Sequence, residues 1–201
     1  MLHSNIPQKK LTGEETLLSD SRQISSVLDY WRWAHSDILD NTERGILAEY
    51  IVACALGLTD KNRTEWDKYD LTYSDSSGEF GIEVKCSSYL QSWVQDSYSA
   101  VSFGIRQTRA WDPVTRKYNS DIRRQSDLYV FCLFSCKDID KINPLDLSQW
   151  EFYVVPTSLL NLKYDAQKRI SLKALESMGI EKTNYPELKD VILQHLKREE
   201  K

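Results

Sequence analysis

The stretch that decides the fold is Glu79-Phe80-Gly81-Ile82-Glu83-Val84-Lys85-Cys86. Polar and apolar residues alternate along it, which is typical of a strand with one face on the core. The apolar positions share the face that we expect to be buried: Phe80, Ile82, Val84 and Cys86. Glu83 and Lys85 share the other face, about 6.6 Å apart along the strand. Gly81 leaves room beside them for another backbone or a ligand.

A second strand is expected just before this one, in Tyr69-Asp70-Leu71-Thr72-Tyr73, and the turn-forming residues 74–78 join the two. Twelve residues separate Asp70 from Glu83, a spacing that lets the two strands fold side by side. The hairpin then gathers two carboxylates and one ammonium group at one end of a sheet. Glu-x-Lys also occurs at Glu187 and Glu199, but in a charged terminal helix where surface charge explains it.

The segment before the hairpin, 42–56, is expected to be a helix that Asp40 or Asn41 caps and Gly57 ends. Glu49 is the one charged side chain between residues 45 and 59. A helix that is apolar nearly all round is buried, so this carboxylate needs a hydrogen bond, a cation, a metal ion or a proton. An ion pair with an arginine of residues 106–124 is one alternative. A site shared with Asp70 and Glu83 is the other.

Three carboxylates with oxygen-only ligation favour a hard divalent cation, Mg²⁺ or Mn²⁺, over zinc. Magnesium usually accepts one or two protein carboxylates and keeps several waters, which leaves positions for a phosphate oxygen and an attacking water. Lys85 would orient that water or stabilise the negative charge that builds up at the phosphorus. The residues therefore indicate a site that could cleave a phosphate ester.

The rest of the chain indicates an α/β protein with a mixed sheet flanked by helices. The elements expected are a helix at 22–38, a strand at 101–105, a loop at 111–120, strands at 127–134 and 151–155, and helices at 171–178 and 186–197. Residues 1–20 are expected to be a loosely ordered lead-in, residues 22–156 the core, and residues 171–198 the C-terminal helices. No domain boundary is visible, so residues 1–201 are expected to form one domain.

The composition is that of a globular protein, with 41% hydrophobic and 28% charged residues, seven Gly and five Pro. The longest apolar run, 128–134, is far shorter than the about 20 residues of a membrane span. Residues 1–15 lack the apolar segment of a secretory signal. We therefore expect a cytoplasmic protein that does not enter a membrane.

The net charge of −4 does not indicate a nucleic-acid binder, but the charge is unevenly distributed. Residues 106–124 carry six basic and two acidic side chains. This segment is either a solvated loop or a surface that faces phosphates. The residues predicted to contact nucleic acid are Arg106, Arg109, Arg123 and Arg124, together with Ser87 and Gln91 directly after Lys85.

The helix with Glu49, the strand with Asp70 and the strand Glu83-Val84-Lys85 resemble, in residues and in order, the PD-(D/E)XK phosphodiesterase superfamily of restriction-endonuclease-like nucleases. The resemblance covers residues 41–86, and Tyr69 stands where the motif has Pro. It implies a three-layer α/β/α fold around a mixed β-sheet. It also implies Mg²⁺-dependent hydrolysis of nucleic-acid phosphodiesters, with DNA favoured over RNA.

The resemblance assigns roles to individual residues. Asp70 and Glu83 would be metal ligands, and the backbone carbonyl of Val84 a further ligand. Lys85 would be the catalytic lysine, and Glu49 an accessory acid that reaches the metal or its water. The chain also resembles small bacterial proteins with segments like Tyr89-Leu90-Gln91-Ser92-Trp93, which adds no function. A homodimer stays open, because many such nucleases act as dimers.

Three hypotheses remain on the sequence alone. The first is a metal-dependent nuclease. The second is a nuclease-like fold that binds nucleic acid or a protein without cutting, which the acidic net charge favours. The third is an α/β protein in which the candidate residues form only a structural charge cluster.

Overall fold

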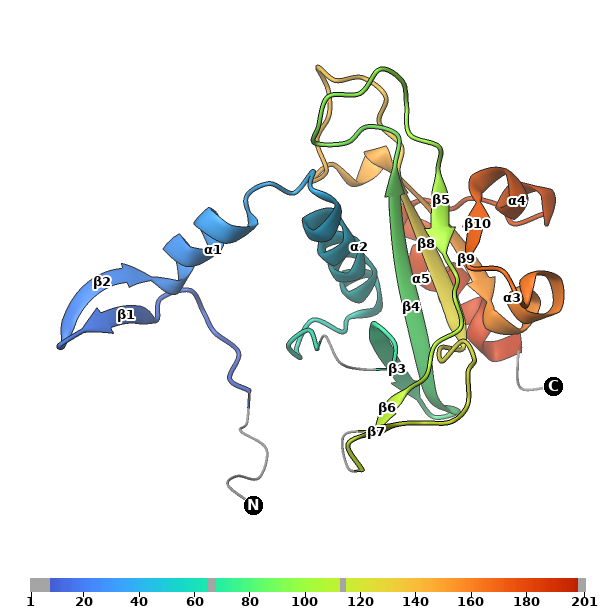
Figure 1. Ribbon diagram of the computed structural model, residues 1–201, viewed down its shortest axis with the longest axis horizontal. Coiled ribbons are helices and arrows are strands. Elements are labelled where there is room, and N and C mark those ends of the chain that lie inside the picture. The colour runs from blue at the N-terminus through green and yellow to red at the C-terminus, as the bar shows by residue number, and fades with distance from the viewer. Residues whose placement is uncertain (1–7, 65–67, 113–114, 199–201) are drawn as a thin grey trace.

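A four-stranded mixed sheet lies at the centre of the computed structural model, which describes residues 8–64, 68–112 and 115–198 (Figure 1). In spatial order its strands are β3 (Leu71–Asp75), β4 (Gly78–Ser88), β8 (Leu128–Phe134) and β9 (Trp150–Pro156). β3 and β9 run antiparallel to their neighbours, whereas β4 and β8 are parallel. The mixed sheet predicted from the sequence is therefore confirmed.

The burial of β8 and β4 explains their different sequence patterns. All seven residues of β8 are buried, because alternate side chains lie in two hydrophobic cores on opposite faces of the sheet, so its sequence is continuously apolar. On β4, Ile82 and Val84 belong to the core, whereas Glu83 and Lys85 are only partly buried. The two predicted faces of β4 are therefore confirmed.

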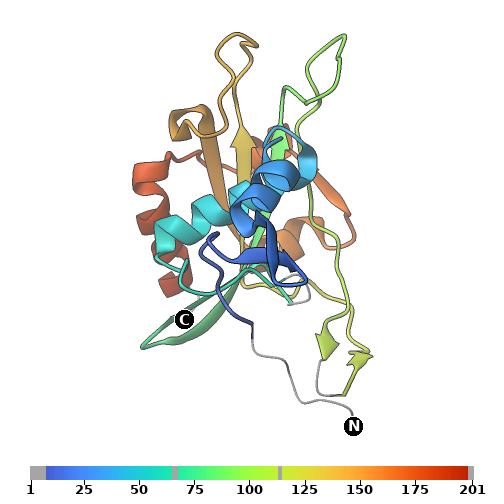
Figure 2. The same ribbon diagram turned by 90° about the vertical axis from the view of Figure 1, so that its left-hand side faces the viewer.

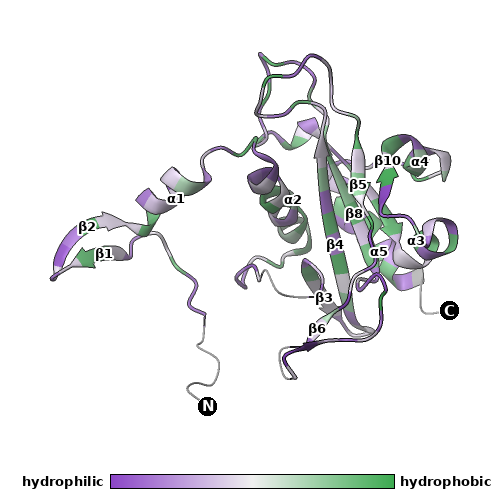
Figure 3. Cartoon of the chain, viewed as in Figure 1, coloured by the Kyte–Doolittle hydropathy of each residue, from purple (hydrophilic) through white to green (hydrophobic). Residues whose placement is uncertain are grey.

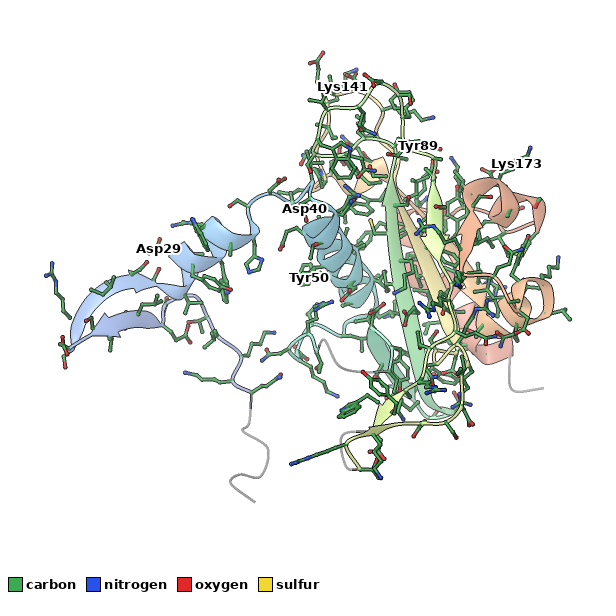
Figure 4. The ribbon with its side chains drawn as sticks, viewed as in Figure 1. Asp29, Asp40, Tyr50, Tyr89, Lys141 and Lys173 are labelled. Carbon is green, nitrogen blue, oxygen red and sulfur yellow. The ribbon has the colours of Figure 1, made fainter. Side chains whose placement is uncertain are left out.

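Helices α2 (Asn41–Leu56) and α5 (Tyr185–Arg198) cover one face of the sheet. Asp40 lies at the start of α2 (Figure 4), where its carboxylate accepts a hydrogen bond of 2.8 Å from the N–H of Thr42. Gly57 ends the helix with a φ of 73°, a conformation that glycine adopts at little cost. Both predicted ends of this helix are confirmed.

The opposite face is covered by a two-stranded ribbon and two short helices (Figure 1). These elements are β5 (Ser102–Gly104) paired with β10 (Arg169–Ser171), α3 (Thr157–Tyr164) and α4 (Leu172–Ser177). Phe103 of β5 packs on Phe131 of β8 with 5.0 Å between ring centroids. Because this layer is only partly helical, the restriction-endonuclease-like α/β/α arrangement remains a prediction.

The N-terminal part differs from the expectation of one helix over 22–38. Residues 22–26 form strand β2 (Arg22–Ser26), which pairs with β1 (Thr16–Ser19) inside the predicted lead-in. The helix, α1 (Val27–His35), begins at Ser26, whose hydroxyl accepts a hydrogen bond from the N–H of Asp29 while the Asp29 carboxylate accepts one from the N–H of Ser26. Apolar spacing predicts a helix but not this capping box, so the observed helix begins at residue 27 instead of 22, and it ends at 35 instead of 38.

Shorter elements also differ. Residues 111–120, expected to be a loop, contain a two-rung hairpin of β6 (Trp111–Asp112) and β7 (Lys117–Tyr118). Pro156, expected only to close a strand, is also the residue from which α3 starts. A short 3₁₀ helix, η1 (Leu147–Gln149), precedes β9. In the described part of the chain, no helix is both long and apolar enough to cross a membrane.

Candidate active site at the open edge of β4

The candidate site lies where β3 ends and β4 continues. β3 pairs with β4 only as far as Ile82, whereas β4 runs on to Ser88. Beyond this point the N–H of Val84 donates a hydrogen bond of 2.8 Å to Oδ2 of Asp70. In a strand the N–H and C=O of one residue point to the same side, so the carbonyl of Val84 faces this edge too. The edge of β4 thus presents backbone groups beside a carboxylate.

Lys85 lies between the two carboxylates of the hairpin. Its Nζ is 2.6 Å from Oε1 of Glu83 and 3.5 Å from Oδ2 of Asp70. Burial alone would lower the pKa of Lys85, but the negative charges of Asp70 and Glu83 outweigh burial and raise it. Lys85 is therefore positively charged at neutral pH.

The carboxylates also act on one another. The pKa of Glu83 is raised, first by burial and then by the negative charge of Asp70, and the nearby Lys85 offsets only part of this rise. Glu49 contributes a further, smaller increase to the pKa of Glu83. The structure therefore brings Glu49, Asp70, Glu83 and Lys85 into one electrostatic neighbourhood, although they come from a helix and a hairpin.

Glu49 pairs with a cation from outside the basic segment 106–124. Its carboxylate accepts two hydrogen bonds from Arg63, of 2.5 Å from Nε and 3.0 Å from Nη2. Of the alternatives for Glu49, a pair with an arginine of residues 106–124 is not the one formed, because the contacting arginine is Arg63. Arg63 is the first arginine after α2, but no periodic pattern links it to Glu49. Burial raises the pKa of Glu49 even so, with Arg63 opposing the rise.

The expectation that α2 is buried on all sides is also corrected. Tyr50, next to Glu49, is 58% exposed and lies on the side of α2 that faces away from the sheet (Figure 4). The Glu49 side chain is 14% exposed, so it lies near the boundary between the inner and outer faces. Water can therefore reach a carboxylate that the helix otherwise shelters.

The space beside Gly81 is filled by an aromatic ring. A methyl group added at Gly81 would overlap the ring of Tyr69. The hydroxyl of Tyr69 also donates a hydrogen bond of 3.4 Å to Glu79. Gly81 therefore makes room for Tyr69 and not for a ligand. Because Tyr69 directly precedes Asp70, its packing fixes the backbone that positions this acid.

Two of the residues predicted to contact nucleic acid are used inside the fold. Arg124 is 4% exposed, and its guanidinium donates to carbonyls of Ile105 and Tyr164 at 2.8 and 2.7 Å. The side chain of Gln91 accepts a hydrogen bond of 3.1 Å from Arg44 and donates one to the carbonyl of Ser88. These contacts hold loops in place, so we no longer count either residue among the predicted phosphate contacts.

The other predicted contacts lie nearer to the surface. Arg106, Arg109 and Arg123 are exposed, in the segment between β5 and β8. Ser87 is partly buried on β4, on the same face as Lys85. These four residues remain predicted contacts with nucleic acid.

The donor set suits a hard cation held by two protein carboxylates. Asp70, Glu83 and the Val84 carbonyl supply only oxygen, and Mg²⁺ commonly uses one or two carboxylates with waters completing its shell. Among residues 8–64, 68–112 and 115–198, no three His, Cys, Asp or Glu side chains are clustered for metal binding. Since Arg63 contacts both oxygens of Glu49, a two-carboxylate arrangement fits better than a three-carboxylate one.

The structure thus shows an α/β protein with two carboxylates and a lysine at the open edge of a strand in a mixed sheet. The family model of bacteriophage T4 endonuclease IV matches residues 7–172. The chain belongs to this endonuclease family, and nucleic acid is the substrate that membership implies. The match contains the whole candidate site and ends before α5. No curated protein matches the chain.

Proposed function

We propose that the protein is a metal-dependent endonuclease of the PD-(D/E)XK type that hydrolyses phosphodiester bonds of DNA. The observation that carries the proposal is the meeting of Asp70, Glu83 and Lys85 at the unpaired half of β4, in a chain of an endonuclease family. The restriction-endonuclease-like resemblance favours DNA over RNA. Mg²⁺ or Mn²⁺ is the proposed cofactor.

In this proposal Asp70 and Glu83 hold the cation, with the Val84 carbonyl as a further ligand. The bound cation would polarise the phosphate and lower the pKa of an attacking water. Lys85 places a positive charge where negative charge builds up on the scissile phosphate. Glu49, which is partly buried and has a raised pKa, would accept a hydrogen bond from the attacking water.

The test is cleavage of labelled DNA during titration with Mg²⁺ or Mn²⁺. The variants are Lys85→Ala and Asp70→Asn, since an amide at position 70 can still accept the hydrogen bond from Val84. Lys182→Ala is the control, because Lys182 also forms a 2.6 Å ion pair, with Glu151, and is outside the site. We expect the control to cleave like the wild type and the two site variants to lose about 10²–10³-fold in rate. Equal cleavage by all four proteins contradicts the proposal.

A second candidate function is binding of nucleic acid without cleavage. This function is favoured because positively charged side chains already neutralise the candidate carboxylates. Lys85 contacts Asp70 and Glu83, and Arg63 contacts Glu49. This candidate predicts binding that weakens with salt and no turnover with either metal ion. The same titration distinguishes the two functions.

A further inference from the structure

The hairpin of β6 and β7 is part of a longer two-stranded ribbon. Beyond the two rungs of the hairpin, a separate bridge joins Thr108 to Arg123 through two backbone hydrogen bonds of 2.9 and 3.1 Å. We call residues 108–112 and 115–123 the ribbon. Figure 2 shows the yellow-green arrows of β6 and β7 apart from the central sheet. The ribbon is therefore a projection whose shape is set by its own backbone hydrogen bonds.

The body holds the ribbon close to the candidate active site. Arg124, directly after the ribbon, donates a hydrogen bond of 2.8 Å to the carbonyl of Ile105, which precedes it. The carboxylate of Asp127 accepts a hydrogen bond of 2.7 Å from the N–H of Gly81, two residues before Glu83 on β4. The chain that leaves the ribbon is thus bound directly to the strand of the site.

The ribbon also leaves the body on the face of the sheet that carries Glu83 and Lys85. Glu83 pairs in register with Tyr129 of β8, so their side chains point to the same face. Tyr129 lies in the hydrophobic core on that face, and Ile105 belongs to the same core. A molecule bound on the ribbon would therefore be on the side from which the site is approached.

Trp111 and Tyr118 form an aromatic face on the ribbon. They are cross-strand partners, so they project to the same face, and their rings meet edge to face with 5.0 Å between centroids. Tyr118 is 57% exposed, so much of its side chain is open to solvent. Alternation along the ribbon places Arg109, two residues before Trp111, on this face as well.

Cations surround this aromatic face. The exposed basic side chains of the ribbon are Arg109, Arg116, Lys117 and Arg123. Only two acids lie between residues 108 and 123, although the whole chain has a net charge of −4. One of them, Asp112, accepts a hydrogen bond of 2.8 Å from the Thr115 hydroxyl. On the hydropathy scale of Figure 3, the end of the ribbon at β6 is hydrophilic, so the exposed ring stands in a polar, positively charged surface.

We propose that the ribbon positions the DNA strand by stacking one of its bases on Tyr118, while Trp111 supports the ring and the neighbouring cations contact phosphates. Aromatic rings beside basic side chains bind strands in this way, because every base has a π-face. Tyr118 precedes Asp127 by nine residues, so the two lie at most about 30 Å apart, within reach of one oligonucleotide. The inference rests on the proposed function, since it names the surface that holds the strand to be cut.

A purely structural role for the aromatic pair predicts a different result. Aromatic residues also pair well with β-branched residues across a ribbon, so Tyr118→Ile keeps the contact with Trp111 but removes the π-face. Tyr118→Phe keeps the ring. Tyr98→Ala is the matched control, because Tyr98 is 54% exposed, also meets another ring edge to face, and lies outside the ribbon.

The test is binding of a fluorescent single-stranded DNA of about 15 nucleotides, the upper size of a common binding site, in EDTA so that no cleavage occurs. We expect Tyr118→Ile to raise the dissociation constant about 10- to 100-fold. Tyr118→Phe and Tyr98→Ala should bind like the wild type. An abasic oligonucleotide of the same length has the phosphates but no bases, so Tyr118→Ile and the wild type should bind it equally.

Arg116→Ala should weaken binding of both oligonucleotides and lower the slope of log K against log salt by about 0.7, as the loss of one phosphate contact does. The proposal is overturned if Tyr118→Ile binds the normal oligonucleotide like the wild type, or if it loses as much affinity for the abasic one. Because binding is measured without a metal ion, a protein that binds through Tyr118 but does not cleave with Mg²⁺ or Mn²⁺ would contradict the nuclease proposal alone.

Discussion

Replacing Lys85 by Met tests whether the ammonium group of Lys85 holds the carboxylates of Glu83 and Asp70 together. Met keeps an unbranched stem but carries no charge, so Glu83 and Asp70 lose the ammonium that lies 2.6 and 3.5 Å from them. The side chains of Glu83 and Asp70 are 20% and 21% exposed, so water only partly replaces the lost ammonium group. Because Lys85 is what limits the rise in the pKa of Glu83, that pKa should rise further in the variant.

We expect Lys85→Met to lower the free energy of unfolding by about 1–3 kcal/mol at neutral pH. Breaking a buried ion pair costs about 3–5 kcal/mol and an exposed pair is worth about 0–1 kcal/mol, and the Lys85 side chain, at 33% exposure, lies between these limits. The loss should depend on pH. Folding raises the pKa of Glu83 above its ordinary 4.5, so protonation favours the folded state. The deficit should therefore shrink as the pH falls through the raised pKa toward 4.5.

Urea unfolding of both proteins at neutral pH and near pH 4.5 measures this effect. Lys182→Met is the control, because Lys182 also forms a 2.6 Å pair but is 61% exposed, so its loss should stay below about 1 kcal/mol. Adding Glu83→Gln to Lys85→Met should restore most of the lost stability, since an amide carries no charge. The reasoning is refuted if Lys85→Met is as stable as the wild type, or is affected no more than the control.

Four further predictions each change a single side chain. Gly81→Ala should lower the free energy of unfolding by about 1–3 kcal/mol, because the added methyl group overlaps the ring of Tyr69. The loss should be smaller in a Tyr69→Ala background. Equal losses in both backgrounds, measured by urea unfolding, would contradict this. Arg124→Ala should cost about 2–4 kcal/mol, since it leaves buried carbonyls without donors, and should leave the salt dependence of nucleic-acid binding unchanged. Arg123→Ala should instead reduce the slope of log K against log salt by about 1. If salt titrations show that Arg124→Ala changes this slope and Arg123→Ala does not, the roles of the two arginines were wrongly distinguished. Glu83→Gln should become more stable relative to the wild type as the pH rises above 4.5, because it removes a group whose pKa folding raises, and a pH-independent difference in unfolding free energy would argue against that shift.

Local patterns were sufficient for the elements that carry the site. Side chains alternate along a strand whatever surrounds it, so Glu83 and Lys85 had to share a face. Asp40 and Gly57 set the ends of α2 because capping involves only the residues next to the helix. The uninterrupted apolar run of β8 indicated a buried strand, and alternate side chains of β8 do lie in the two hydrophobic cores on opposite faces of the sheet.

Tertiary structure decided which charged groups meet. Arg123 and Arg124 are neighbours in a basic segment, yet one is exposed and the other is buried where β5 and α3 come together. Glu49 pairs with Arg63 because the chain after α2 returns past the helix, which no spacing rule foresees. Both outcomes depend on the paths of segments distant in sequence.

The sequence by itself therefore determined the strand that presents Glu83 and Lys85, the helix that presents Glu49, and the mixed sheet behind them. Only the folded chain decided that β3 stops opposite Ile82, that the Asp70 carboxylate binds the N–H of Val84, and that the hairpin β1–β2 and helix α1 lie outside both cores. The physical reason is how far apart along the sequence the interacting residues lie. Side-chain direction and helix caps follow from neighbouring residues, whereas burial and ion-pair partners depend on free energies that arise only when remote segments pack together.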